Sequence, residues 1–261
     1  MRRISSEYRF SQKRSLSQCF LVDDRILDRE AAEAGVRSRV VLEVGPGFGF
    51  LTKRLAAAGA KEVIALEKDE RLIPILEAEL APYENVRVIH ADFLKWKPEK
   101  FNVFVSNVPY SISSPLLFKL AELDFSHAIL CLQKEFVERM LAQPGESEYS
   151  RLSLTSQARF GIRHLGKIHR TCFRPSPKVD SALVELVPTG KKLTPETEKL
   201  ILLLFQHKKK TVRAALSDSA EQLGITKDEA RKLAEKSGLS DRRVFTLTKE
   251  DFALLSRFAG G

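Results

Sequence analysis

The stretch that decides the fold is V-L-E-V-G-P-G-F-G-F-L-T, residues 41–52. It has the pattern of a buried strand, a glycine-rich turn and the start of a helix. Glycines let a backbone turn sharply and approach a ligand closely, while the free N–H groups of the helix start face that ligand. The stretch therefore predicts an α/β protein with a nucleotide-like ligand. A plain glycine turn without a ligand is the alternative at this point.

Short apolar runs extend the strand pattern along the chain. Segments of helical periodicity separate them, which predicts an α/β sheet with helices on both faces. The first four runs have few polar residues on either face, as is typical of parallel strands covered on both sides. The expected strands are residues 40–44, 62–66, 86–89, 103–105, 128–132 and 182–187.

The composition changes after Val187. Residues 188–192, P-T-G-K-K, have the character of a linker, and only helical periodicity follows. Helix starts are expected at Thr194, at Thr226 with its capping-box spacing, and at Thr248. We therefore expect two domains: residues 1–188 hold the sheet and a basic N-terminal segment, and residues 189–261 form a small all-helical domain.

The charge distribution indicates the kind of partner. The chain has 261 residues, 43% hydrophobic and 30% charged, which suits a globular protein, and its net charge is +9. Residues 1–20 carry +4 and residues 189–261 carry +5, whereas the stretch between them is balanced. Basic ends around a neutral middle favour binding of a polyanion such as nucleic acid. A merely solubilising surface is the alternative.

Several classes of protein are disfavoured. No apolar run approaches the roughly 20 residues that a bilayer requires, and no apolar block of a signal peptide follows the basic start, so a cytoplasmic protein without membrane contact is expected. Cys19, Cys131 and Cys172 are far apart and form no C-x-x-C pair. Neither a disulfide framework nor a zinc site is therefore indicated. The five histidines lack metal-ligand spacing, and no metal is expected.

The spacing of the glycines separates the candidate ligands. They stand as G-x-G-x-G, with Phe50 where the dinucleotide fingerprint G-x-G-x-x-G needs its third glycine. A phosphate-binding P-loop sequence is absent. Glu43, just before Gly45 and Gly47, would repel a phosphate but can balance a cation. This combination favours a sulfonium cofactor.

Acidic residues end the next two strands. Glu67, which ends the second expected strand, can accept both ribose hydroxyls of an adenosine. Asp92, after the third, can accept from the adenine amine, and Phe93 can cover the ring. Each acid alone is more often a solvated strand end. Three acids at the carboxyl edge of one sheet, beside a glycine turn, favour S-adenosylmethionine and a Rossmann-like methyltransferase sheet.

The fourth strand ends in N-V-P-Y, residues 107–110. The side-chain oxygen of Asn107 and the main-chain oxygen of Val108 can accept the two hydrogens of an adenine amine and aim its lone pair at a methyl group. Pro109 stiffens the turn, and Tyr110 offers a face on which the base can stack. A proline turn with an aromatic residue in the core is the alternative. The position after the fourth strand favours catalysis.

Four motifs and one basic segment together resemble a known family. They are S-Q-C-F-L at 17–21, E-V-G-P-G-F-G-F-L-T at 43–52, N-V-P-Y at 107–110, F-R-P-S-P-K-V-D-S-A at 173–182 and F-Q-H-K-K-K-T-V-R-A-A-L at 205–216. In order and spacing they resemble the ribosomal RNA adenine dimethyltransferases, KsgA of bacteria and its archaeal and eukaryotic counterparts. The last segment resembles that family's basic helix.

The resemblance implies a reaction, a partner and further site residues. It implies dimethylation of N6 of two adjacent adenines near the 3′ end of small-subunit rRNA, within ribosome biogenesis, on the rRNA or the pre-small subunit. A monomer is expected. Phe173 would join Asn107 and Tyr110 around the target adenine. The cofactor would be lined by Gln18, Leu21, Gly45, Glu67, Asp92 and Asn107. Cys19 replaces the family's Asn, which leaves a main-chain contact at that position.

The basic run Lys208, Lys209, Lys210 and Arg213 covers more than one helical face. Such a run suits contact with RNA phosphates better than pairing along one stripe. Alternative functions are a large-subunit rRNA adenine methyltransferase, a non-catalytic ribosome-assembly or transcription factor on the same fold, and a small-molecule methyltransferase. The basic segment favours the small-subunit enzyme over the large-subunit one, and the intact N-V-P-Y argues against a silent binder.

Overall fold

The computed structural model describes residues 19–259, which divide into two compact units. We call the first the sheet unit; it contains residues 19–137 and 161–188. The second, the helical unit, contains residues 138–160 and 189–259. The helical unit thus takes in residues 138–160 in addition to the expected C-terminal segment, because Tyr149 and Leu154 are buried in its core. None of the described helices is long and apolar enough to cross a membrane.

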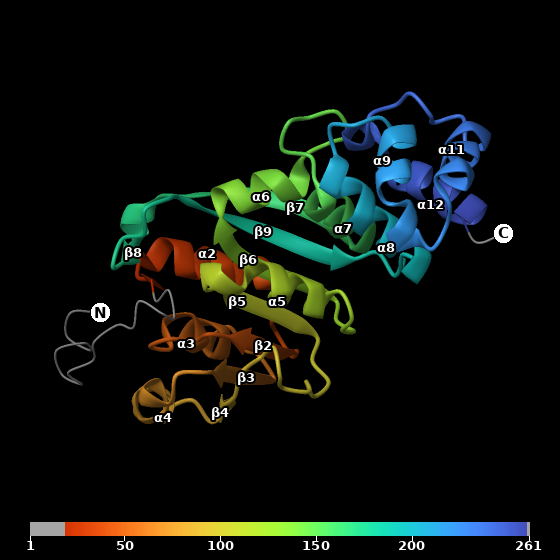
Figure 1. Cartoon of the computed structure of the whole chain (residues 1–261). Coiled ribbons are helices and arrows are strands. Elements are labelled where there is room, and N and C mark those ends of the chain that lie inside the picture. The colour runs from red at the N-terminus through yellow and green to blue at the C-terminus, as the bar shows by residue number, and fades with distance from the viewer. Residues whose placement is uncertain (1–18, 260–261) are drawn as a thin grey trace. The chain divides into compact units, whose positions relative to one another are not determined.

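The sheet unit is built on a seven-stranded sheet of order β4-β3-β2-β5-β6-β9-β7 (Figure 1). Strands β4, β3, β2, β5 and β6 are parallel, and β9 pairs antiparallel with β6. The strands are β2 (Val40–Val44), β3 (Glu62–Glu67), β4 (Val86–His90), β5 (Val103–Asn107), β6 (His127–Gln133), β7 (Phe160–Ile168) and β9 (Ser181–Pro188). All six expected runs form strands, which confirms the predicted α/β class. The sequence pattern did not predict β7, because Arg163, His164 and Lys167 interrupt the run of apolar residues in this strand.

Two further strands form a small antiparallel ladder outside the main sheet. Strand β1 (Phe20–Leu21) pairs with β8 (Phe173–Arg174), with Leu21 opposite Phe173. Strands of two residues are too short for a sequence pattern to indicate. This ladder brings the segment before α2 beside the segment before β9.

Helices cover the sheet on both faces. They are α2 (Asp24–Ala34), α3 (Phe50–Ala57), α4 (Ile73–Leu80) and α5 (Ser113–Leu120), with α6 (Lys134–Leu141) crossing the boundary between the units and short 3₁₀ turns η2 (Glu70–Leu72), η3 (Tyr110–Ile112) and η4 (Arg170–Cys172). At the start of α2 the side chain of Asp23 accepts the N–H of Arg25.

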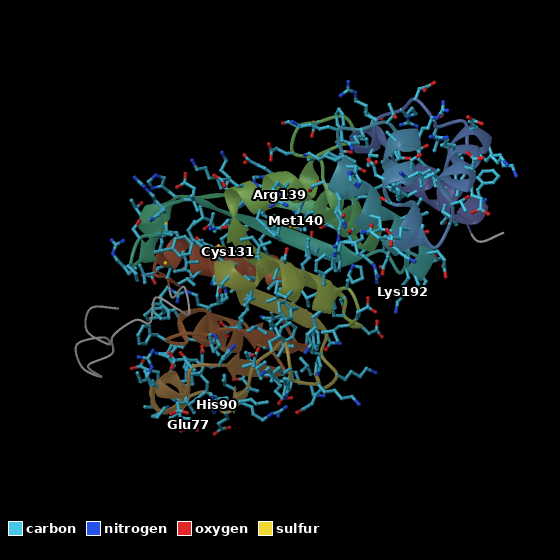
Figure 2. All side chains as sticks on the ribbon, viewed as in Figure 1. Glu77, His90, Cys131, Arg139, Met140 and Lys192 are labelled. Carbon is cyan, nitrogen blue, oxygen red and sulfur yellow. The ribbon has the colours of Figure 1, made fainter. Side chains whose placement is uncertain are left out.

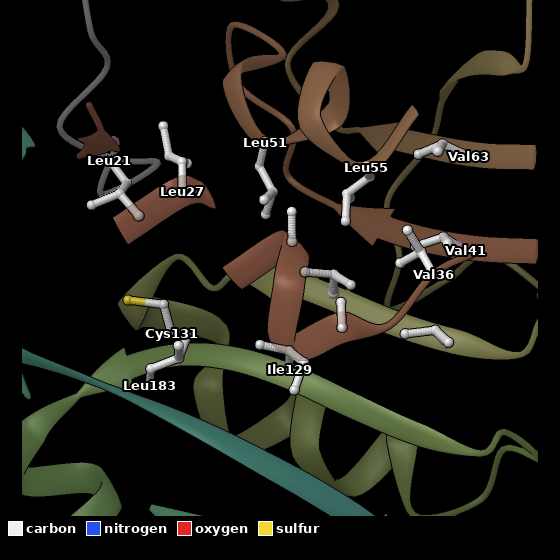
Figure 3. Packing of buried hydrophobic residues seen from close by; sticks show 14 of the residues in the cluster. Leu21, Leu27, Val36, Val41, Leu51, Leu55, Val63, Ile129, Cys131 and Leu183 are labelled. Carbon is white, nitrogen blue, oxygen red and sulfur yellow. The ribbon is translucent and has the colours of Figure 1, made fainter. Parts of the chain in front are cut away.

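The core between the sheet and helices α2 and α3 is aliphatic (Figure 3). Leu27 of α2 and Leu51 and Leu55 of α3 pack against Val41 of β2 and Val63 of β3. Successive strand residues point to opposite faces, so every second residue of each strand contributes to this layer. Burying one such aliphatic side chain contributes roughly 1.5–3 kcal/mol to stability.

The parallel register aligns the ends of the strands. Val44 lies opposite Leu66, Glu67 opposite His90, and Asn107 opposite Cys131. The loops that follow β2, β3, β4 and β5 therefore leave the sheet at one edge. Cys131 lies inside the sheet and the exposed His90 at its margin (Figure 2).

The helical unit has a core of its own. Its elements are α7 (Arg151–Arg159), α8 (Pro195–Leu204), η5 (Phe205–His207), α9 (Val212–Asp218), α10 (Ala220–Leu223), α11 (Lys227–Lys236), η6 (Val244–Thr246) and α12 (Lys249–Ala259). Thr194 caps α8 and Thr226 forms a capping box with Glu229, as predicted. Buried Tyr149 donates its hydroxyl to the carbonyl of Leu247 at 2.8 Å, which fastens the loop before α7 to this core.

Candidate active site

A pocket opens at the carboxyl edge of the parallel strands, within the sheet unit. It is lined by the loops after β2, β3, β4 and β5 and by β1 and β8. The predicted site residues that line it are Cys19, Leu21, Glu43, Gly45, Gly47, Glu67, Asp92, Phe93, Asn107, Val108, Pro109, Tyr110 and Phe173. Gln18 and the basic segment before it lie outside the described residues. The structure thus brings the predicted catalytic and cofactor residues of its described part to one cavity.

The glycine turn forms the floor of this pocket. Gly45 and Gly47 have φ angles of +73° and +61°, a backbone conformation that residues other than glycine rarely adopt. A Cβ added at Gly47 would lie 2.7 Å from the ring of Phe20. That ring packs on Phe48 with 4.7 Å between centroids. The turn therefore needs glycine for its backbone and also for the close approach of β1.

Glu67 is held rigidly at the end of β3. One carboxylate oxygen accepts the N–H groups of Lys68 and Asp69, each at 2.8 Å, and the other accepts the N–H of Gly47 at 3.3 Å. Burial raises the pKa of Glu67, and these three N–H donors oppose the rise. The oxygen facing Gly47 keeps acceptor capacity, which suits a hydroxyl group of a ligand.

Asp92 and Phe93 form another wall. Asp92 pairs with the ammonium of Lys68 at 2.9 Å, and its other oxygen accepts a backbone N–H at 3.0 Å. The ion pair holds the pKa of Asp92 below its ordinary value. Phe93 is 3% exposed, and the ammonium of Lys119 lies 4.7 Å from its ring centroid and donates to its carbonyl. Lys119, which the sequence reasoning missed, thus anchors this wall from α5.

Glu43 is a buried acid beside the glycine turn. Its side chain is 2% exposed, and its Oε2 has no hydrogen-bond partner among residues 19–259. Burial, together with the nearby Glu67, raises its pKa to about 8. A buried carboxyl without a counter-ion is costly, and a cationic ligand would remove that cost by favouring the ionised form.

Asn107 ends β5 with its amide in a defined orientation. Its Nδ2 donates to Oε2 of Glu30 at 3.1 Å. Its Oδ1 is buried and lacks a hydrogen-bond partner in the described part of the chain. Sequence reasoning missed Glu30. The feature that could have identified it in the sequence is an acidic residue among the buried residues of α2, between Leu27 and Ala34.

Tyr110 and Phe173 supply aromatic walls. The hydroxyl of half-buried Tyr110 lies 2.7 Å from Oγ of Ser181 on β9, which holds the ring in place. Phe173 is 3% exposed: it lines the pocket and is also part of the core beneath α2. Ser181 lies within the motif at 173–182, but the sequence alone suggested no role for it.

The predicted basic helix takes a different form in the helical unit. Lys208–Lys210 lie in a turn between η5 and α9, because Thr211 caps α9 and the helix begins only at Val212. The carbonyls of Lys208 and Lys210 accept N–H groups from residues 244–245. The expectation that the whole run is helical is therefore wrong. The exposed Arg243, beside the turn, donates to the carbonyl of Lys209 and was not predicted.

The four predicted basic residues have different surroundings. Lys208 is half-buried and donates to two backbone carbonyls at 3.0 and 3.4 Å. Lys210 pairs with Asp218 at 2.7 Å. Lys209 and Arg213 are exposed. Lys208 thus holds a loop of the unit. Lys209 presents its charge to solvent, whereas the exposed Arg213 lies 4.0 Å from a carboxylate oxygen of Glu235.

Comparison with known proteins agrees with this fold and pocket. A family model described as ribosomal RNA adenine dimethylase matches residues 9–253. A probable ribosomal RNA small subunit methyltransferase A of Pyrococcus furiosus is 44% identical over 97% of this chain and 94% of its own length. The same description applies to a relative in Thermococcus sibiricus, 42% identical with the same coverage.

Two solved structures are similar over most of the chain. A dimethyladenosine transferase from Plasmodium falciparum superposes with a TM-score of 0.80 and 33% identity, over 90% of this chain and 95% of that one. The 23S rRNA methyltransferase ErmE gives 0.67 and 27%, over 93% and 100%. The fold is that of a Rossmann-like methyltransferase. The chain belongs to the ribosomal RNA adenine dimethylase family.

Proposed function

We propose that this protein transfers methyl groups from S-adenosylmethionine to N6 of two adjacent adenosines near the 3′ end of small-subunit rRNA, giving dimethyladenosine. One observation carries the proposal: a buried amide oxygen, Asn107 Oδ1, is left without a partner in a pocket lined by the residues predicted for the cofactor. Buried polar atoms in proteins are nearly always hydrogen-bonded, so an unpartnered acceptor calls for a donor from outside the chain.

The residues of the pocket fit the cofactor chemically. The carboxylate of Glu67, fixed by three backbone N–H groups, is suited to ribose hydroxyls. Asp92 is kept ionised by Lys68 and is suited to an adenine amine. Glu43, buried beside the turn, is suited to the positive charge of the methionine end. When bound, the cofactor supplies a methyl group on a sulfonium.

Catalysis then rests on orientation. The amine of adenine is a poor nucleophile because its lone pair is delocalised into the ring. Asn107 Oδ1 and the carbonyl of Val108 accept its two hydrogens and favour a pyramidal nitrogen. Holding the reacting groups in this way lowers the barrier without a strong base. The nitrogen becomes cationic on transfer and releases its proton to water.

The aromatic walls hold the base. Stacking on Tyr110, whose ring is fixed through Ser181, contributes roughly 1–3 kcal/mol. Phe173 closes the pocket from β8. The target adenosine has to leave any duplex, or come from a loop, before it can enter such a cavity.

The small subunit is the favoured target. The two small-subunit methyltransferase relatives described above are 42% and 44% identical to this chain, whereas the 23S rRNA methyltransferase ErmE is 27% identical. The exposed Lys209, Arg213 and Arg243 of the helical unit are suited to phosphates of the RNA. A non-catalytic binder on the same fold would have no use for the unpartnered oxygen of Asn107.

The test is transfer of labelled methyl to immature small subunits, followed by mass analysis of the nucleosides. Wild-type protein is expected to yield dimethyladenosine. Asn107→Ala is expected to bind the cofactor and lose turnover. Asn102→Ala, which removes an amide at the opposite end of the same strand and outside this pocket, is the control and should keep turnover. Absence of methylated adenosine with wild-type protein would refute the proposal.

A further inference from the structure

We propose that Glu30 is a positioning residue for the reaction, holding the amide of Asn107 so that its oxygen, and not its nitrogen, faces the target amine. The inference rests on the proposed function. The geometry behind it is one contact: Asn107 Nδ2 donates to Glu30 Oε2 at 3.1 Å, while Asn107 Oδ1 is left unpartnered. Glu30 itself does not line the pocket.

The two ends of an amide are chemically opposite. Nδ2 only donates hydrogen bonds and Oδ1 only accepts them. A flipped amide would present N–H groups to the hydrogens of the adenine amine, and the two sets of donors would repel each other. It would also exchange the Nδ2–Oε2 hydrogen bond for a contact between Oδ1 and Glu30, where two acceptors meet whenever the carboxyl is ionised. Ionised Glu30 therefore disfavours the orientation that would block the reaction.

The position of Glu30 is hard to explain by stability. The residue is 0% exposed, on the apolar stripe of α2, and its Oε1 has no partner among residues 19–259. Burial raises its pKa to about 8; it interacts electrostatically with Glu43 and Cys131, and no cation of the described residues lowers its pKa. A leucine at this position would suit the aliphatic core better. The retained acid therefore points to the contact it makes with Asn107.

Three variants separate positioning from packing. Glu30→Leu keeps the volume and removes the acceptor. Glu30→Gln keeps an acceptor oxygen for Asn107 Nδ2 and removes the charge. Glu33→Gln, one turn along the same helix and outside the pocket, is the matched control. Thermal unfolding and calorimetric binding of the cofactor are measured for each, and all three are expected to fold and bind it within about threefold of wild type.

The first readout needs no activity. In a ¹H–¹⁵N spectrum, the side-chain amide of Asn107 is assigned by its loss in Asn107→Ala. Its protons are expected to exchange slowly with solvent in wild type and Glu30→Gln, and rapidly in Glu30→Leu. Equal exchange in wild type and Glu30→Leu would overturn the proposed contact, whatever reaction the protein catalyses.

The second readout is turnover on small-subunit RNA. Because small misplacements of reacting groups cost up to about a hundredfold in rate, we expect kcat to fall about 10- to 100-fold in Glu30→Leu with little change in KM, and to stay within about threefold in Glu30→Gln. In an Asn107→Ala background, Glu30→Leu should cause no further loss.

Two results would overturn the positioning role. One is normal kcat in Glu30→Leu; the other is a further loss in the Asn107→Ala background, which would mean that Glu30 acts by another route. Wild-type protein that methylates no adenosine would instead refute the proposed function. In that case the hydrogen-exchange measurement alone would test whether Glu30 holds the amide of Asn107.

Discussion

Glu43→Gln is expected to abolish a proton release that accompanies cofactor binding. The side chain is buried beside the glycine turn with an unpartnered Oε2, and its pKa is about 8. At pH 7 it is therefore only about one-tenth ionised. A sulfonium bound nearby favours the carboxylate and lowers this pKa. If the pKa falls to about 6, each cofactor molecule displaces about 0.8 proton at pH 7.

The sign of the pH dependence follows from this pKa. Binding selects the ionised form, so between the pKa of Glu43 in the complex and its pKa in the free protein the affinity rises with pH by up to about tenfold per pH unit. The rise ends above pH 8, where the free protein is already ionised. S-adenosylhomocysteine lacks the sulfonium charge and is expected to release fewer protons than S-adenosylmethionine.

Calorimetry in buffers of different ionisation enthalpy measures the proton count directly. Glu43→Gln is expected to release far fewer protons than wild type at pH 7. Glu33→Gln is the control, because it removes an acid of α2 that does not line the pocket, and it should keep the release. Heats that are independent of the buffer in wild type, or an unchanged proton count in Glu43→Gln, would show that Glu43 does not release a proton on binding.

Two further predictions concern residues with defined hydrogen-bond partners. Lys208→Met should lower the free energy of unfolding by about 1–2 kcal/mol in a denaturant titration, because the Lys208 ammonium donates to two backbone carbonyls. Lys209→Gln should leave the free energy of unfolding unchanged and reduce the salt slope of RNA binding by about 1. The reverse pattern would mean that the roles of the two lysines are exchanged. Tyr110→Phe and Ser181→Ala should each weaken binding of the target base to a similar extent, raising KM or lowering kcat by about 10-fold in a methyl-transfer assay. The two effects should not add in the double variant, because both substitutions remove the same hydrogen bond. Additive losses would show that the two residues do not act through this hydrogen bond.

The strands and their functional ends were predictable from the sequence. Apolar runs such as residues 40–44 and 103–105 leave few alternatives to buried strands, and parallel strands bring their carboxyl ends together. Glu43, Glu67, Asp92 and Asn107 therefore meet at one pocket although 64 residues separate the first from the last. Residue type and place in the sheet were sufficient for this part of the site.

Other features depend on tertiary contacts that no local pattern carries. Glu30 resembles a solvated helix residue until the packing of α2 buries it against Asn107. Strand β7 could not be recognised as a strand from the sequence, because one of its faces is polar and carries charged residues. The sequence suggests that Lys208 binds RNA, because it lies in a basic run. The structure shows instead that its ammonium donates to a backbone carbonyl of the loop before α7. Residues 138–160 join the helical unit through Tyr149, whose partner Leu247 lies far along the chain.

A crystal structure with the cofactor analogue sinefungin and adenosine bound tests the proposed pocket most directly. We expect the ribose of the analogue within hydrogen-bond distance of Glu67, and the N6 amine of adenosine between Asn107 Oδ1 and the Val108 carbonyl, facing the amino group that stands for the transferable methyl. An analogue seated elsewhere, or an adenosine whose amine lies away from Asn107, would contradict the account.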